Sequence, residues 1–365
     1  MSGRRSKHID EDYEEEVVRK PSKKKKKKKR HIFLKILLVL LMLIAIALGT
    51  IVGFAYSMLD QMEFDNQVDK NTIEVNDGVE TAKGTVNIAL FGVDARNQKN
   101  SYSGSLSDVI MIVSINQDTK KVRIASVYRD TYLQMSDTKK FDKITHAFGR
   151  GPQISINSLN SNLDLDIKDY VAINFNVVVD VVDAVGGVTV DVTREEALQM
   201  TNYIDEINNT TGHKSKHLTK AGTYTLDGVQ ATAYARIRYT EGGDWKRTER
   251  QRKILDLTFE KVKKMNLAQL KSLADTVLKQ VSTNITTSQI ISLAASAGSY
   301  EIEETKGWPF EVADYKLNGV WYGPPRNLEK QVIELHEFLF PEEEYEPSEN
   351  VRAISDKLIK QTGIK

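Results

Sequence analysis

The feature that most constrains this chain is a long uncharged segment that directly follows a run of cations. Residues 23–29 are all lysine and Arg30 follows them, whereas residues 36–59 contain no charged side chain. Those 24 residues are rich in Leu, Ile, Val and Ala, and they are enough to span a bilayer with some tilt. A cleaved signal peptide has a shorter apolar core. The segment therefore predicts an uncleaved membrane anchor, with a buried core helix as the alternative.

The lysine run also predicts an orientation, because cationic flanks stay on the cytoplasmic side of a membrane. The bulk of the chain would then lie outside the cell. Residues 1–30 carry a net charge of +7 and residues 36–365 a net charge of −7, so the overall +1 hides two opposite regions. An acidic extracellular part is unsuited to general nucleic-acid binding, although the lysine run itself could touch anionic lipid headgroups or nucleic acid.

Composition and pattern together predict five regions. A disordered cytoplasmic tail (1–31) precedes the transmembrane segment (32–59), an extracellular stalk (60–84), a folded extracellular domain (85–340) and a C-terminal tail (341–365). Cysteine is absent, which excludes disulfides, thiolate catalysis and cysteine-ligated metals.

The domain predicted from residue 85 onward mixes strand and helix patterns. Buried-strand patterns occupy 86–91, 109–115, 122–127, 170–175 and 187–192. Helical periodicity occupies 154–163, 177–185, 227–235, 244–265, 267–280, 287–297 and 328–339, with Asp244 as a candidate N-cap. The predicted fold class is α/β of the α+β kind, in which helices flank a central mixed, largely antiparallel sheet.

An arginine cluster is the strongest chemical signal in this domain. Five arginines fall within seventeen residues: Arg236, Arg238, Arg247, Arg250 and Arg252. Guanidinium groups match phosphate oxygens in a bidentate way, so the cluster points to a localised, multiply charged anion, unless it is a solvated helix face with salt bridges. Arg247 and Gln251 are four residues apart and share one helix face.

Two aspartates are placed to complement the arginines. Asp94 follows one predicted strand and Asp108 precedes the next, so the two carboxylates would meet at one rim of the sheet if those strands are neighbours. Such a pair suits Mg²⁺, which takes one or two carboxylates together with water and phosphate oxygens. Each aspartate alone is an ordinary turn or cap residue.

Eight motifs in sequence order give the chain a family resemblance. They are NIALFGVDAR (87–96), SDVIMIVSIN (107–116), YRDT (128–131), KITHA (143–147), VDAVGGV (182–188), LDGVQA (226–231), YARIR (234–238) and RTERQ (247–251). Their order across a motif core of about 85–265, behind a single anchor, resembles the LytR-CpsA-Psr family of the Gram-positive cell envelope.

The resemblance implies a single-pass plasma-membrane transferase. Such a protein moves a glycopolymer, for example wall teichoic acid or a capsular polysaccharide, from undecaprenyl pyrophosphate to peptidoglycan. By motif position, Asp94 and Asp108 would bind Mg²⁺ (or Mn²⁺). The residues implied to contact the pyrophosphate or to complete the site are Arg129, Arg236, Arg238, Asp244, Arg247 and Gln251. A hydrophobic tunnel would hold the polyprenyl chain.

Two positions depart from the family pattern. Leu106 stands where an arginine is usual, which removes one phosphate contact unless Lys143 or Lys246 compensates, and Thr145 replaces an asparagine. The Leu106 departure keeps a second hypothesis open, that the domain captures polyprenyl phosphates without turning them over. A membrane-bound transcriptional regulator is the third hypothesis, with residues 1–31 as its only DNA-facing part.

Overall fold

The structure is a computed structural model. It describes residues 63–64, 68–80, 82–93, 104–240, 243–277, 280–296 and 299–365. The chain divides into units 1–54 and 55–365, and every described residue belongs to the second unit. The predicted tail (1–31) and anchor (32–59) lie outside the described residues. Within the described part, no helix is both long and apolar enough to cross a membrane.

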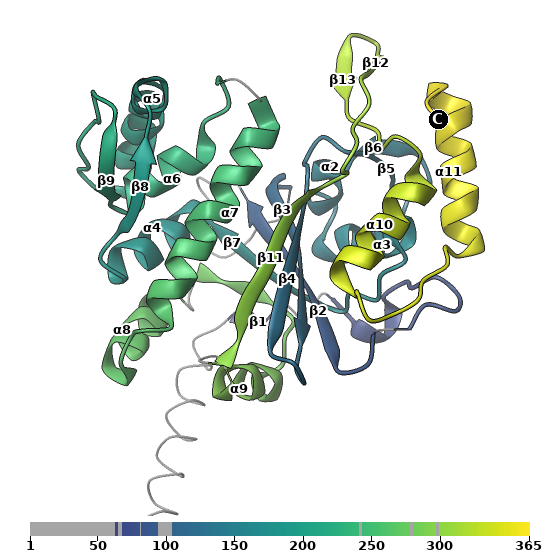
Figure 1. Cartoon of the computed structure of the whole chain (residues 1–365), viewed down its shortest axis with the longest axis horizontal. Helices are drawn as coiled ribbons and strands as arrows, with labels where there is room; N and C mark the ends of the chain where they lie inside the picture. Colours follow the sequence, from purple (N-terminus) through teal and green to yellow (C-terminus); the bar gives the residue numbers. More distant parts are fainter. Residues whose placement is uncertain are drawn as a thin grey trace, which may run out of the picture. The chain divides into compact units, whose positions relative to one another are not determined.

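A seven-stranded mixed sheet forms the centre of the fold (Figure 1), in the order β1-β10-β7-β2-β3-β4-β11. Its strands are β1 (Glu63–Phe64), β2 (Thr85–Val93), β3 (Ser107–Asn116), β4 (Lys121–Val127), β7 (Asp169–Asn174), β10 (Ser282–Thr283) and β11 (Glu301–Trp308). The antiparallel pairs are β10–β7, β2–β3 and β3–β4, and the parallel pairs are β1–β10, β7–β2 and β4–β11. The predicted mixed sheet flanked by helices is confirmed, but with three pairs of each kind it is evenly mixed and not largely antiparallel.

Both faces of the sheet are covered. Along β3, Ile110 and Ile112 point into one core and Met111 into another, as the period of a strand requires. The first face packs against α2 (Thr145–Phe148), α3 (Pro152–Leu163), α10 (Leu328–Leu339) and α11 (Glu349–Thr362). The second face packs against α7 (Gly243–Val262) and α9 (Thr287–Ala295). The sheet is therefore the middle of a helix–sheet–helix sandwich.

A second hydrophobic core lies beside the sheet (Figure 1, left). It is built from α4 (Phe175–Ala184), β8 (Val188–Val192), α5 (Arg194–Thr211), β9 (Gly222–Leu226) and α6 (Gly228–Arg236), with α8 (Leu267–Val277) packed on α4. The two helices α4 and α6 approach closely at Gly228, where a Cβ would lie 2.2 Å from the Val179 carbonyl oxygen. Only glycine allows this spacing between α4 and α6.

Two short hairpins lie outside the central sheet. β5 (Tyr132–Gln134) pairs with β6 (Phe141–Lys143), and β12 (Tyr315–Leu317) pairs with β13 (Val320–Tyr322). The second hairpin stands away from the sheet at the top of Figure 1. A 3-10 helix, η1 (Lys70–Thr72), lies near the start of the described chain.

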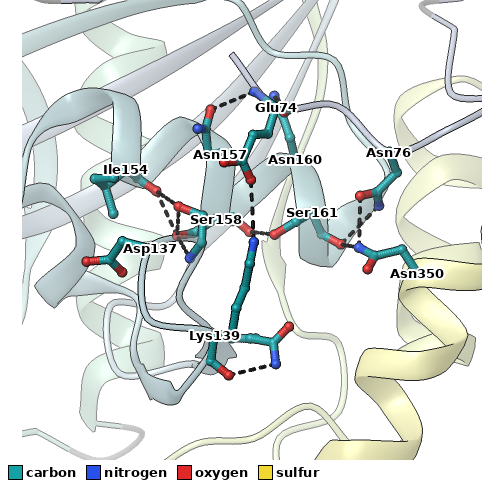
Figure 2. A network of polar contacts seen from close by, with 12 residues as sticks. Glu74, Asn76, Asp137, Lys139, Ile154, Asn157, Ser158, Asn160, Ser161 and Asn350 are labelled. Carbon is teal, nitrogen blue, oxygen red and sulfur yellow. Dashed lines mark hydrogen bonds and ion pairs between the residues drawn. The ribbon is translucent and has the colours of Figure 1, made fainter. Parts of the chain in front are cut away.

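Helix α3 is buried although it is rich in asparagine and serine, because its polar side chains bond the segments around it (Figure 2). Asn157 Oδ1 accepts a hydrogen bond from the Glu74 backbone N–H at 3.0 Å, and Asn160 Nδ2 donates to the Glu74 carbonyl at 3.1 Å. Asn350 Nδ2 donates to the Ser161 carbonyl at 3.0 Å. Satisfied polar groups of this kind make burial tolerable, and they fix residues near both ends of the described chain onto one helix.

The folded unit extends beyond the predicted bounds 85–340 on both sides. Val68, in the predicted stalk, joins the core of the first sheet face. The segment predicted as a C-terminal tail ends in α11, whose Val351, Ile354 and Leu358 are buried in that same core. The spacing of these three residues is helical, but only the tertiary partners reveal that the helix is covered.

The packing of α11 generates a stability prediction. Ile354→Ala removes a side chain that is 1% exposed, and we expect it to lower the free energy of unfolding by about 2–5 kcal/mol. Lys357→Ala, an exposed position on the same helix, is the matched control and should change stability little. Chemical denaturation of the full-length chain in detergent measures both. Equal effects of the two substitutions would contradict the packing of α11 on the core.

Candidate functional site

An irregularity in the β2–β3 ladder exposes Asp108 at the rim of the sheet. Gly92 pairs with Val109, whereas the next residue, Val93, pairs with Ser107, so Asp108 is left without a partner in the ladder. A bulge of this kind bends the strand and redirects a side chain. Gly92 is required here, because a Cβ would lie 2.8 Å from the Val109 Cβ.

The strand start that carries Asp108 is tied to α2. Thr145, the first residue of α2, donates from its hydroxyl to the Ser107 carbonyl at 2.8 Å. The KITHA segment therefore positions the bulge, with Thr145 serving where the family pattern has an asparagine.

Two guanidinium groups converge on Asp108. Arg129 follows the end of β4 and donates from Nη1 to Asp108 Oδ1. Arg238, two residues beyond α6, places its Nη2 3.6 Å from the same oxygen. Arg129 also lies 3.7 Å from Asp130, whose carboxylate is bonded to Lys143 Nζ at 2.9 Å. The structure thus brings three of the predicted site residues into one charged cluster, which we call the Asp108 cluster: Asp108, Arg129 and Arg238.

An apolar cavity of about 230 Å³ lies beside this cluster, over the face of the sheet formed by β7, β2 and β3. Its walls come from the sheet and from α4, α6 and α7, with Leu90, Val109, Met111, Val178, Val182 and Ile254 among the lining side chains. Arg236 and Gln251 also line it, which places two further predicted site residues at one cavity. A long hydrocarbon is the kind of ligand that such walls favour.

Arg236 is held in a fixed orientation at this cavity. Its guanidinium carbon lies 4.7 Å from the centroid of the Phe175 ring and 5.1 Å from that of Tyr203, and Nη2 donates to Glu206 at 3.3 Å. These contacts restrict the Arg236 side chain but occupy only part of its five N–H donors, so the others can still bind a ligand.

The remaining arginines of the cluster have different surroundings. Arg250 is buried and donates to Glu196 Oε1 at 2.9 Å, to the Ile237 carbonyl at 3.2 Å and to the Thr240 hydroxyl at 2.8 Å. Those contacts make Arg250 a structural tie between α5, α7 and the loop that carries Arg238.

Arg247 and Arg252 also lie on α7. The Arg247 residue is only 3% exposed. Burial lowers the pKa of Arg252 and raises the pKa of Asp256, one helical turn further on. Arg252 is not among the residues that line the cavity. The five arginines of the sequence cluster therefore fall into two groups. Arg236 lines the cavity and Arg238 lies at the rim. The other three are not among the residues that line the cavity: Arg247, Arg250 and Arg252.

Two predicted site residues cannot be placed. Asp94 lies outside the described residues, and so does the side chain of Asp244. Helix α7 begins at Gly243, so Asp244 is its second residue and not the predicted N-cap. Asp108 is the described member of the predicted metal pair, and its carboxylate is of the oxygen-ligand type that Mg²⁺ prefers. Among the described residues, no group of three or more acidic, histidine or cysteine side chains is arranged to hold a metal ion.

The two candidates to compensate for Leu106 differ in their contacts. Lys246 Nζ bonds Glu249 at 2.8 Å on the outer surface of α7, whereas Lys143 reaches Asp130 beside Arg129. Leu106 itself is 38% exposed near the start of β3. Lys143 is therefore the better placed of the two.

Sequence reasoning missed two carboxylates that orient the arginines. Glu196 and Glu206 both lie on α5, a helix that was not predicted. The signal was present, because Thr193 and Glu196 form a capping box, a pattern that marks a helix start in a sequence. Their pairing with Arg250 and Arg236 depends on tertiary packing and has no local signature.

Comparison with known proteins identifies the family to which the chain belongs. A model of the LytR_cpsA_psr family matches residues 50–336. The chain belongs to this family. Members with solved structures share the fold: Bacillus subtilis TagT (YwtF), described as carrying a bound octaprenyl pyrophosphate lipid, has a TM-score of 0.52 and 25% identity, covering 74% of this chain and 95% of that one.

Two curated relatives in the family are named polyisoprenyl-teichoic acid–peptidoglycan teichoic acid transferase TagU. The Bacillus mycoides protein is 31% identical over 289 residues, 75% of this chain and 85% of the relative. The Enterococcus faecalis protein is 30% identical over 186 residues, 50% of this chain and 56% of the relative. The chain thus spans little more than half the length of the second relative.

The division of the arginines generates a paired prediction. Arg250→Ala leaves Glu196 as a buried, uncompensated carboxylate, and we expect the free energy of unfolding to fall by about 3–5 kcal/mol. Arg238→Ala, whose side chain is 40% exposed, should change stability by less than about 1 kcal/mol. Denaturant unfolding of the full-length chain measures both. A large loss for Arg238→Ala with none for Arg250→Ala would reverse the assignment.

Proposed function

We propose that this domain transfers a glycopolymer from a polyprenyl pyrophosphate carrier to peptidoglycan. The observation that carries the proposal is an apolar cavity with Arg236 and Gln251 in its lining and the Asp108 cluster at the adjoining rim. A ligand that combines a hydrocarbon chain with a pyrophosphate matches both parts. The relatives named TagU and the lipid described for TagT support the same ligand class.

The hydrocarbon chain would lie along the β7–β2–β3 face. Burial of its carbons is favourable by roughly 25 cal/mol for each Å² removed from water, and most of the residues that line the cavity are apolar. The pyrophosphate would then lie at the Arg236 and Gln251 side of the cavity, where cationic and amide donors replace its hydration shell.

The arginines would stabilise charge during the reaction. Arg129 and Arg238 hold positive charge at the rim, and Asp108 fixes their orientation before a ligand arrives. Donors preorganised in this way do not have to reorient as charge develops on the transferring group. Arg236 is similarly fixed by Phe175 and Glu206.

Mg²⁺ (or Mn²⁺) is the cofactor we propose, held by Asp108 with Asp94 as the second carboxylate. Bound there with the pyrophosphate, the ion would neutralise charge on phosphate oxygens. Asp108 would then divide its two oxygens between the metal and the guanidinium groups, which is compatible with the ligand capacity of a carboxylate.

The reaction is a phosphoryl transfer. An acceptor hydroxyl oxygen bonds to the phosphorus that carries the glycopolymer, and the bond from that phosphorus to the bridging oxygen breaks. Polyprenyl phosphate leaves with the bridging oxygen, and a phosphodiester joins polymer and acceptor. The hydroxyl proton passes to a carboxylate, for which Asp94 and Asp244 are the two candidates.

The cavity gives a prediction for donor length. Ala235 lines the cavity on α6, and Ala235→Trp should fill part of it. We expect weaker binding of long-chain polyprenyl pyrophosphate, by about tenfold or more, with little effect on a donor of one or two prenyl units. Ala184→Trp, an exposed position on α4, is the control. Titration calorimetry with both donors tests this, and equal losses for both donors would contradict a role of the cavity in holding the chain.

A transfer assay tests the function itself. The full-length chain in detergent is mixed with a polyprenyl-pyrophosphoryl disaccharide, peptidoglycan oligomers and Mg²⁺, and mass spectrometry follows polyprenyl phosphate and the covalent product. We expect product that disappears with chelator and falls about 10²–10³-fold in Arg238→Ala. Tight donor binding without product, even in Leu106→Arg, would instead favour the capture hypothesis that Leu106 motivates.

A further inference from the structure

The site has a fixed order across the sheet. The cavity lies over β7, β2 and β3, Asp108 on β3 pairs with Arg129, the second residue after β4, and Tyr128 lies immediately beyond β4. Because β4 pairs with β3 on one side and with β11 on the other, Tyr128 lies on the far side of β3 from β2 and β7, two of the strands that line the cavity.

An exposed tryptophan covers this far side. Trp245 is in the first turn of α7, one residue after Asp244, and is 51% exposed. Its ring centroid lies 6.4 Å from that of Tyr128, with 47° between the ring planes. Tryptophan is seldom left this exposed without a partner, and here an aromatic pair adjoins a predicted phosphate-binding residue, Arg129.

Strand β11 leaves room for the Tyr128 ring because it has a glycine, Gly307, beside it. A Cβ on Gly307 in β11 would lie 2.2 Å from the Tyr128 hydroxyl oxygen and 2.7 Å from the ring carbon that bears it. The Tyr128 backbone N–H also donates to the Trp308 carbonyl at 3.0 Å. The phenol ring therefore lies against bare backbone, and Trp245 packs on it from α7.

The geometry of in-line phosphoryl transfer determines the side from which the acceptor approaches the donor. The attacking and leaving oxygens lie on opposite sides of the transferred phosphorus. If the leaving polyprenyl phosphate belongs to the cavity side, the attacking hydroxyl must arrive from the β4 side, where Tyr128 and Trp245 lie.

We propose that Trp245, supported by Tyr128, is the subsite for the acceptor sugar. The flat indole face matches the apolar C–H face of a pyranose ring, and stacking there would present a sugar hydroxyl toward the Asp108 cluster. This inference rests on the proposed transferase function and adds the residue that binds its acceptor glycan.

Separate kinetic constants for donor and acceptor test the subsite. Trp245→Ala should raise the acceptor KM about tenfold, leave the donor KM within about twofold, and be largely rescued in Trp245→Phe. Leu198→Ala, an exposed apolar position on α5, is the control for loss of surface area and should change neither constant. An unchanged acceptor KM in Trp245→Ala, or a rise in the donor KM instead, would overturn the proposal.

A binding measurement separates this inference from the transferase proposal. The chain has three tryptophans, and Trp308 is fully buried. Peptide-free peptidoglycan glycan oligomers, added without donor, should change the fluorescence of the full-length chain but not of Trp245→Phe. This result would support the subsite even if no transfer were detected. Transfer in the wild type with no Trp245-dependent fluorescence change would leave the function intact and contradict the subsite.

Discussion

Pairing of guanidinium groups with carboxylates is the constraint on which the site depends. Charged side chains that leave water need a partner, and four arginines near the sheet rim have a carboxylate partner. Asp108 serves Arg129 and Arg238, Glu206 serves Arg236, and Glu196 serves Arg250. These carboxylates balance the charge of the arginines and also fix the orientation of their guanidinium groups. The consequence is a rigid set of donors beside an apolar cavity.

The two faces of the sheet divide stability from function. One face is filled by α3, α10 and α11, and the polar interior of α3 ties together segments far apart in the chain. The other face packs against α7 and α9 and also borders the cavity, whose remaining walls come from α4, α6 and α7. The close approach of α4 and α6 at Gly228 keeps that space bounded. The first face is therefore packed throughout, whereas the second combines a packed core with the cavity.

Local patterns predicted much of the fold and the identity of the rim residues. The apolar run in 109–115 and the helical periodicity of 244–265 correspond to β3 and most of α7. The bulge at Asp108 could not be predicted, because it depends on the register between two strands. The carboxylate partners on α5 and the burial of α11 could not be predicted either, because both arise from tertiary packing. The sequence also could not separate Arg250, which is structural, from Arg238, because only their surroundings differ.

The most direct test of the account is to map where the lipid lies. A polyprenyl pyrophosphate with a photoreactive diazirine at its hydrocarbon end would be cross-linked to the full-length chain, and the labelled peptides identified by mass spectrometry. The account predicts labels on the cavity walls of α4, α6 and β2–β3, reduced in Ala235→Trp. Labels confined to the α3–α10–α11 side of the sheet would contradict it.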